Sequence, residues 1–330
     1  MIAPVDLEAC RSAIRTGSLS FHAASRLLPA RVRDPALALY AFCRLADDAV
    51  DDGDDKADAV LRLRDRLDRV YRGQPANAAA DRAFTGVVDG FDMPRALPDA
   101  LLEGMAWDAV GRQYDDLSGV LDYAARVAAS VGAMMCVLMR VRDGDALARA
   151  CDLGLAMQLT NIARDVGEDA RAGRVYLPLD WLRDEGVTDL RVASSGQRRC
   201  VARLLTHARV LYARSEAGVS VLPLDCRPGI FAARYIYDGI GGQVAKAGFD
   251  SVTQRARTSG RQKLGWLGLS ILRSGAAAVL PRAPALHANP APEVEFLVAA
   301  ASRAAPLRGR SDALLGVLAQ LEARDRAMSA

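Results

Sequence analysis

The chain has 330 residues, of which 51% are hydrophobic, 5% aromatic and 25% charged, and its formal net charge at pH 7 is +3. This net charge is small, and the basic residues are dispersed among acidic ones without interleaved aromatic side chains. Both features argue against nucleic-acid binding. The six cysteines show no C-x-x-C spacing, and with the three histidines they make no zinc signature, so reduced thiols in a cytoplasmic protein are expected.

Ala, Leu, Arg and Val dominate the composition, which favours helices, and no stretch has the pattern of a strand. The predicted fold is therefore all-α. We expect one large domain over residues 1–285, and a proline-rich linker with a helical tail, packed on or beside it, over residues 286–330. In chain order, helices are predicted at residues 5–16, 35–52, 57–72, 79–90, 98–114, 119–141, 153–169, 195–221, 228–249 and 262–278.

No segment has the signature of a signal peptide or of a membrane-spanning helix. Residues 127–139 and 264–271 are the most apolar, and both are too short to cross a bilayer. The first is apolar nearly all round, so its helix should be central. Its small residues either pack a core or leave room for a long apolar ligand.

Asp34 and Pro35 are predicted to start a helix, and the first acidic cluster lies at the end of that helix. It follows an apolar run and Arg44, and its carboxylates recur at four-residue spacing; its members are Asp47, Asp48, Asp51 and Asp52. Upstream, Ser18 and Ser20 form a polar bend. These serines either cap a helix or donate hydrogen bonds to a phosphate.

A second cluster repeats this pattern far along the chain. Asn161, Asp165 and Asp169 share one helical stripe next to Arg164, again after an apolar run. Like charges four residues apart cost a helix about 0.2–0.5 kcal/mol, so a neutralising partner is expected. Carboxylates suit Mg²⁺, which takes further ligands from phosphates, and arginines suit the phosphates themselves. The two clusters together predict a metal–diphosphate site across a cavity.

Other polar residues leave alternatives open. An acidic pair on a helix is usually a solvated face, although two such pairs beside arginines are harder to explain in that way. The side chains of Asp108 and Tyr114 either reach the cavity mouth or lie on the surface, and we expect the surface. The basic segment 171–178, which contains Gly173, is a candidate lid over a bound diphosphate.

With these residues assembled, the chain resembles the squalene/phytoene synthase family from about residue 18 to residue 263. The segments that carry the resemblance are 18–21 with 24–29, 40–51, 123–132, 158–169, 173–178, Tyr237 and 255–263. Two positions depart from the family pattern: Leu19 stands where a basic residue is common, and His22 where an aromatic is usual. Arg126, where squalene-forming members tend to carry Tyr, favours the phytoene-forming branch.

The resemblance implies an all-α isoprenoid (prenyl) synthase bundle around a central cavity. It implies Mg²⁺, with Mn²⁺ as a possible substitute, held by Asp47, Asp51, Asp165 and Asp169 with Asp48 and Asp52 as neighbours. It assigns the diphosphate to Arg44, Arg164 and Arg174. The substrate-lining residues would be Tyr40, Gln158, Asn161 and Tyr237, together with Ser18 and Ser20.

The implied reaction joins two geranylgeranyl diphosphates head to head, through a cyclopropyl diphosphate, to phytoene, the first committed step of carotenoid biosynthesis. No NADPH is expected. The alternatives are a squalene synthase, which needs NADPH, a dehydrosqualene synthase using farnesyl diphosphate, and a catalytically silent helical scaffold. Because substrate and product are lipids, we expect weak binding to the inner face of the cell membrane and a downstream desaturase as a partner.

Overall fold

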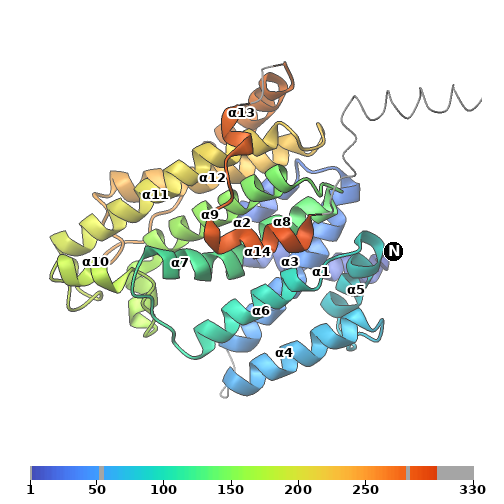
Figure 1. Cartoon of the computed structure of the whole chain (residues 1–330), viewed down its shortest axis with the longest axis horizontal. Helices are drawn as coiled ribbons and strands as arrows, with labels where there is room; N and C mark the ends of the chain where they lie inside the picture. The colour runs from blue at the N-terminus through green and yellow to red at the C-terminus, as the bar shows by residue number, and fades with distance from the viewer. Residues whose placement is uncertain (1, 52–55, 280–282, 303–330) are drawn as a thin grey trace, which may run out of the picture.

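The computed structural model describes residues 2–51, 56–279 and 283–302, with side chains described outside residues 47–58. Throughout these ranges the regular structure is helical, which confirms the all-α prediction (Figure 1). The first elements in chain order are α1 (Pro4–Gly17), α2 (Leu19–Ser25), α3 (Ala30–Asp51), α4 (Lys56–Tyr71), α5 (Ala79–Phe91), α6 (Ala96–Ala109), α7 (Leu117–Ala124), η1 (Ala125–Ala129) and α8 (Ser130–Leu138). They are followed by α9 (Gly144–Arg171), α10 (Leu179–Asp184), α11 (Ser195–Val219), α12 (Arg227–Lys246), α13 (Gly260–Val279), η2 (Pro284–His287), η3 (Pro292–Val294) and α14 (Glu295–Ala301).

The start of α3 differs from the prediction. The helix begins at Ala30, one turn earlier than expected, and Pro35 lies inside it. The earlier start arises because the carbonyl of Pro29 accepts hydrogen bonds from the backbone amides of Val32 (2.9 Å) and Arg33 (2.8 Å). A complete turn therefore exists before Pro35, whose missing amide removes only one bond near the helix start.

Helix α9 is the central element of the bundle. It is 28 residues long, and the Asp143 carboxylate caps its start by accepting a hydrogen bond from the Ala146 amide at 2.9 Å. It packs along much of its length against α11, and also against α8, η1 and α12 (Figure 1). The second acidic cluster lies on its last two turns, so this central helix also carries two of the candidate metal ligands, Asp165 and Asp169.

The predicted central apolar helix is interrupted by a π-helical turn, η1. The helical stretch Leu117–Leu138 is long and apolar enough to span a membrane, contrary to our prediction from segment length, but 56% of its apolar window is buried within the protein. Gly104 on α6 and Gly154 on α9 let both helices approach this turn closely. A Cβ on Gly154 would lie 2.6 Å from Ala129 Cα. The π turn is thus accommodated between two glycines, consistent with the association of such turns with functional sites.

Replacing Gly154 with alanine will therefore destabilise the fold. The added methyl group meets backbone atoms of Ala128 and Ala129, which cannot move aside as a flexible side chain would. We expect the free energy of unfolding to fall by about 1–3 kcal/mol, measured by urea denaturation. Gly242→Ala is the matched control, since that mid-helix Cβ meets nothing within 4 Å and should be neutral or stabilising. Equal stability of Gly154→Ala and the parent would contradict this account.

The described C-terminal segment docks on the bundle. Helix α14 packs against α6, α8 and α9, and Leu297 and Ala301 are fully buried there. The guanidinium of Arg142 donates hydrogen bonds to the carbonyls of Ala301 (3.2 Å) and Asp92 (2.8 Å). The remainder of the predicted helical tail lies outside the described residues.

Candidate active site

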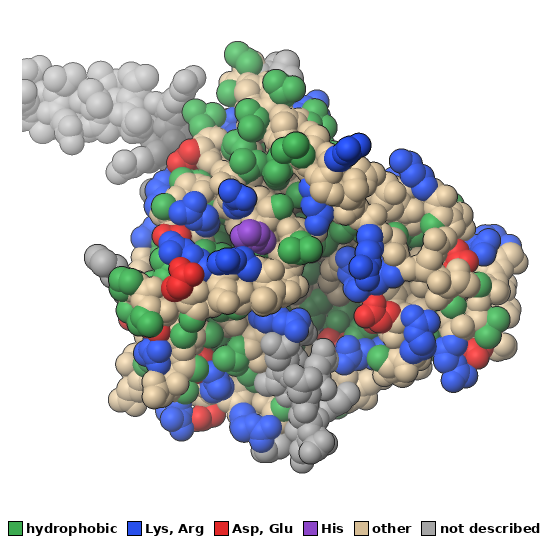
Figure 2. Space-filling view, turned by 180° about the vertical axis from the view of Figure 1, so that it is seen from behind, with side chains coloured by type: hydrophobic (Ala, Val, Ile, Leu, Met, Phe, Trp, Pro, Cys, Tyr) green, Lys and Arg blue, Asp and Glu red, His purple; other side chains and the backbone are tan. Residues whose placement is uncertain are grey.

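An apolar cavity of about 310 Å³ runs through the centre of the bundle, with walls from α2, α3, η1, α8, α9, α11 and α12. Its lining is almost entirely aliphatic and aromatic, with contributions that include Leu37, Val131, Met135, Leu153 and Met157. The face shown in Figure 2 is hollowed, with hydrophobic side chains in the recess and basic side chains around it. The small residues of the central helix therefore do leave room for an apolar ligand.

Aromatic rings form one wall of this cavity. The Phe21 ring centroid lies 6.2 Å from that of Tyr40 and 5.4 Å from that of Tyr237, so three helices, α2, α3 and α12, meet here. Burial raises the pKa of Tyr237 to about 12, so its hydroxyl stays protonated. Ser18 hydrogen-bonds this hydroxyl and also caps α2 by accepting from the Phe21 amide at 3.3 Å. Ser18 thus caps α2 and contacts Tyr237 of the cavity wall, although it is outside the set of lining residues in the described chain.

Four residues predicted to line the substrate site do line the cavity: Tyr40, Gln158, Asn161 and Tyr237. The Asn161 amide donates a hydrogen bond to Gln158 Oε1 at 3.3 Å, which orients two polar groups on an otherwise apolar wall. Ser20 lies on the first turn of α2, half-buried, and is outside the set of lining residues in the described part of the chain.

Asp165 lies one turn beyond Asn161 and holds two arginines. Its Oδ1 accepts hydrogen bonds from Arg164 Nε (2.8 Å) and Arg255 Nε (2.7 Å), and its Oδ2 accepts from both guanidiniums as well. Burial alone would raise the pKa of Asp165, but these bonds outweigh it and the pKa is lowered. Arg255 Nε also lies 3.0 Å from Glu168 Oε2. Arg255 was not among the predicted site residues, although its segment belonged to the family resemblance.

Asp169 lies on the next turn, and its pKa is shifted upward, in the opposite direction to that of Asp165. Burial, and then the negative charge of Asp165, raises its pKa to about 7. Arg174 opposes this shift and lies close by, since its backbone amide donates a hydrogen bond to the Asp169 carbonyl at 2.8 Å. Gly173 makes the turn between them with φ of +75°, a conformation that favours glycine. The end of α9 therefore carries a half-buried carboxylate without enough positive charge beside it, which fits a divalent cation.

A tyrosine network supports this end of the cavity. Asp108 accepts hydrogen bonds from the hydroxyls of Tyr123 (2.8 Å) and Tyr176 (2.7 Å), and its charge contributes to the raised pKa of Asp169. Tyr114 is buried, with its ring centroid 5.4 Å from that of Tyr123. The surface placement predicted for Asp108 and Tyr114 is therefore wrong, because burial of the neighbouring tyrosines draws the segment inward. Through Tyr176, Asp108 fixes the connection that carries Arg174.

Helix α3, which carries the first acidic cluster near its end, contributes to the cavity wall. Tyr40 and Cys43 on α3 line the cavity opposite Gln158 and Asn161 on α9. Tyr40 and Arg164 both act on the ionisation of Tyr237, which places the three side chains together. Helix α3 continues past Tyr40 to Asp51 as α9 continues past Asn161 to Arg171.

Among the predicted members of the first cluster, Arg44 is exposed on α3. Asp47, Asp48 and Asp51 belong to the last turns of that helix, with side chains outside the described residues, and Asp52 lies outside them altogether. In the part of the chain with described side chains, no group of three or more His, Cys, Asp or Glu residues is gathered as a metal ion would need. A metal at Asp165 and Asp169 would therefore take further ligands from the first cluster or from a substrate.

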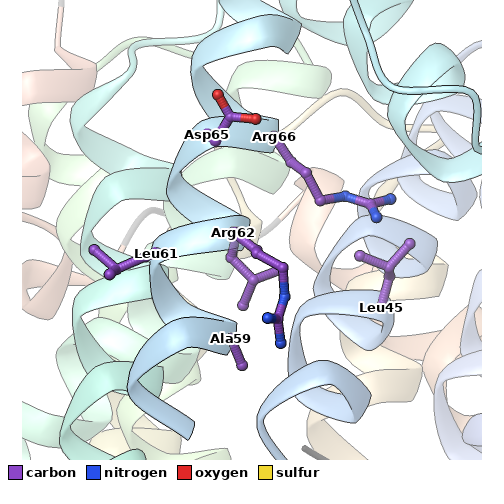
Figure 3. A pocket seen from close by; sticks show the side chains of 7 residues that line it. Leu45, Ala59, Leu61, Arg62, Asp65 and Arg66 are labelled. Atoms are coloured by element: carbon purple, nitrogen blue, oxygen red, sulfur yellow. The ribbon is translucent and has the colours of Figure 1, made fainter. Parts of the chain in front are cut away.

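A shallower hollow between α3 and α4 is lined by Leu45, Leu61 and Arg62 among others (Figure 3). Arg66 from this hollow reaches Asp81 on α5, with Nη2 2.8 Å from the buried Oδ2. Arg66 thus joins α4 to α5, and the candidate active site is the central cavity.

A helical bundle with an apolar cavity, and with paired carboxylate and guanidinium groups one turn beyond Asn161 in its wall, suits a synthase whose substrates have a long apolar tail and a diphosphate head. The family model described as squalene/phytoene synthase matches residues 14–262. The chain belongs to this family, whose members are prenyltransferases that condense two prenyl diphosphates.

Individual relatives agree with this placement. The chain is 65% identical to a phytoene synthase of Cereibacter sphaeroides, covering 100% of this chain and 97% of that protein. It is 58% identical to a phytoene synthase of Rhodobacter capsulatus, covering 100% and 99%.

Solved structures show the same fold. A dehydrosqualene synthase bound to a ligand superposes with a TM-score of 0.77 at 32% identity, covering 82% of this chain and 97% of that one. A squalene synthase from Alicyclobacillus acidocaldarius superposes with a TM-score of 0.69 at 26% identity, covering 75% and 97%. The predicted isoprenoid synthase bundle is confirmed.

Proposed function

We propose that the protein condenses two molecules of geranylgeranyl diphosphate head to head to give phytoene. The observation that carries this proposal is an apolar cavity lined by Asn161, one helical turn before Asp165 and its two arginines, since this matches a substrate with a long hydrocarbon tail and a charged head. The two relatives that are phytoene synthases, similar over the whole chain, support this product over squalene or dehydrosqualene.

We further propose that the acidic clusters hold Mg²⁺, with Mn²⁺ as a substitute. Asp165 and Asp169 would bind it together with Asp47 and Asp51, with Asp48 and Asp52 as neighbours in the first cluster. The raised pKa of Asp169 supports this, because a nearby cation would stabilise the carboxylate that burial disfavours. When bound, the metal neutralises charge on the departing diphosphate.

Residues of the chain itself would bind the diphosphate during both ionisations. Arg44, Arg164, Arg174 and Arg255 would bind phosphate oxygens, and as the first C–O bond breaks its electron pair leaves with the diphosphate. The second substrate's double bond attacks the allylic cation and a proton is lost, which gives the cyclopropyl diphosphate. A second ionisation, rearrangement and proton loss complete phytoene, so no hydride donor such as NADPH is required.

The cavity wall would protect these cations. The faces of Phe21, Tyr40 and Tyr237 offer negative π density beside the charged end. The aliphatic lining excludes the water that would otherwise capture a carbocation. The buried phenol of Tyr237, kept protonated by its raised pKa, adds no competing anion.

The direct test is a product assay with purified protein and Mg²⁺. It compares farnesyl with geranylgeranyl diphosphate, each with and without NADPH. We expect phytoene from the C20 substrate and no effect of NADPH. Squalene formed only with NADPH, or dehydrosqualene as the main product, would replace the proposal with one of its alternatives. No product from either substrate would indicate a silent scaffold.

We also propose that the protein is cytoplasmic and binds weakly to the inner face of the membrane through α13, where a desaturase would take over the apolar product. Helix α13 packs on α12, yet Leu264 is 70% and Leu272 is 73% exposed. Figure 2 shows hydrophobic side chains gathered on this part of the molecule, at the top of the view. Arg261 and Lys263 at the start of the same helix complement anionic lipid.

Sedimentation with vesicles tests this surface. We expect binding to vesicles containing 30% phosphatidylglycerol, weaker binding to pure phosphatidylcholine, and loss of binding in Leu264→Ser/Leu272→Ser. The exposed pair Val192→Ser/Val210→Ser, away from α13, serves as the control. Complete recovery of the parent protein in the supernatant with anionic vesicles would refute the membrane proposal.

A further inference from the structure

Arg149 is a fully buried arginine that borders the apolar cavity. Its side chain is 0% exposed, and among the residues that line the cavity in the described chain it is the only charged one. A buried guanidinium is unfavourable unless it is paired and hydrogen-bonded. Its position in the wall of a hydrocarbon site therefore calls for an explanation, and none of the steps proposed above uses it.

The guanidinium is clamped on the side away from the cavity. Its Nε lies 2.9 Å from Oδ2 of Asp152, which is also fully buried, and Arg214 Nε lies 3.1 Å from the same oxygen. Arg149 Nη1 donates a hydrogen bond to the Ala285 carbonyl (2.5 Å), and its Nη2 to the Asn289 carbonyl (3.4 Å). Arg214 Nη2 donates to the Asn289 carbonyl as well, at 2.8 Å. Two helices and the segment after α13 thus hold one side chain in place.

With the charge bound in this way, the aliphatic stem is left to face the cavity. Gly218 on α11 packs against this stem, since a Cβ on Gly218 would lie 2.3 Å from Arg149 Cβ and 3.0 Å from its Cγ. The stem therefore cannot swing toward α11. A leucine at this place would change rotamer at little cost, whereas Arg149 cannot move without breaking a buried ion pair.

Arg149 stands at the end of the cavity opposite the charged residues. Along α9 it lies twelve residues before Asn161, about 18 Å along the helix axis at 1.5 Å per residue. The residues that join it there are Met139, Ala146, Val219 and Leu222. A prenyl chain with its diphosphate at Asp165 would extend along α9 toward this end.

We propose that Arg149, clamped by Asp152, Arg214 and the carbonyls of Ala285 and Asn289, is the end wall of the prenyl cavity and sets the longest chain that the enzyme accepts. This inference rests on the proposed function, because it takes the occupant to be a prenyl diphosphate. It also gives the segment that contains η2 a role: this segment holds the wall from outside.

The test measures binding of unreactive prenyl thiolodiphosphates with C15, C20 and C25 chains by calorimetry. The opening variant is Arg149→Ala/Asp152→Asn, which removes the stem and avoids an unpaired carboxylate while keeping a partner for Arg214. The parent should bind C20 about 10–200-fold more tightly than C25, the range expected when extra methylenes meet a closed wall. The double variant should bind C25 and C20 within about threefold of each other.

The opposite change is Ala146→Leu, which adds bulk one turn before Arg149 at the same end of the cavity. It should weaken C20 binding about tenfold relative to C15. The matched control is Arg142→Ala, because Arg142 also clamps the C-terminal segment through a carbonyl, that of Ala301, but does not line the cavity. Its chain-length ratios should equal those of the parent.

An unchanged ratio of C25 to C20 binding in the folded double variant would overturn the end-wall assignment, as would an equal shift in Arg142→Ala. If the double variant does not fold, Ala146→Leu decides the matter, and an unchanged ratio of C20 to C15 overturns the assignment. A parent protein that binds none of the three analogues refutes the proposed function itself. Normal C20 binding with unaltered ratios refutes only the end wall.

Discussion

Replacing Asp165 with asparagine will lower kcat about 10²–10³-fold and leave the helical content unchanged. Asparagine has the same shape but no charge, so it loses both the affinity for a cation and the ion pairs with Arg164 and Arg255. Because we propose that these groups all act on the departing diphosphate, we expect their joint loss to raise the barrier of each ionisation. The loss should appear mainly in kcat, since the apolar cavity still binds the hydrocarbon chain.

The measurement is steady-state formation of phytoene, with circular dichroism to verify folding. Asp189→Asn is the matched control, because Asp189 also pairs with an arginine, Arg191, but lies on the surface away from the cavity. It should retain parental activity. Asp47→Asn should show the same large loss as Asp165→Asn. Near-normal turnover in either of these two variants would mean that the metal assignment is wrong.

The polar lining of the cavity was predictable because it depends on local spacing. Gln158 and Asn161 line the cavity, and with Asp165 they recur at three- and four-residue intervals after an apolar run, so a helix must place them on one face. The helix forms, although it begins at Gly144, well before the predicted start at residue 153. Tyr40 follows from the same argument on α3. What the pattern could not give is which groups meet across the bundle.

The missed residues are those whose partners lie far away in the sequence. Arg255 joins Asp165 across 90 positions from a segment without regular structure, so no periodicity marks it. Asp108 and Tyr176 are likewise separated by 68 positions. Arg149 interrupts an apolar stretch and reads as a surface charge until Asp152 and the carbonyls beyond α13 are seen around it.

The π turn at η1 was also beyond prediction, because it depends on packing between helices and not on propensity. The sequence of residues 125–129 suits an ordinary α-helix. The turn coincides with the close approach of Gly104 and Gly154 from two other helices. Helix existence was thus predictable from periodicity, whereas this local distortion was set by neighbours that only the folded chain brings together.

Replacing Asp169 with asparagine should stabilise the metal-free protein while it abolishes activity. Burial and the charge of Asp165 raise the pKa of Asp169 to about 7, well above the ordinary value of 3.8. Between about pH 4 and pH 7 the folded state therefore binds more protons than the unfolded state, so the stability of the parent falls as pH rises through this window. Asparagine carries no charge at any of these pH values, so the variant does not lose stability in this way as pH rises.

The gain in the free energy of unfolding from Asp169→Asn should be near zero at pH 4 and should reach about 1–2 kcal/mol at pH 8. It is smaller than the whole pKa shift would give, because the carboxyl is partly exposed to solvent. Thermal melts in EDTA at pH 5 and pH 8 measure it, and the gap in Tm should widen at the higher pH. Adding Mg²⁺ should raise the Tm of the parent more than that of the variant, since only the parent gains a ligand for its buried charge. A lower Tm for the variant at pH 8, or a gap that does not change with pH, would show that Asp169 is already compensated by Arg174 and needs no cation.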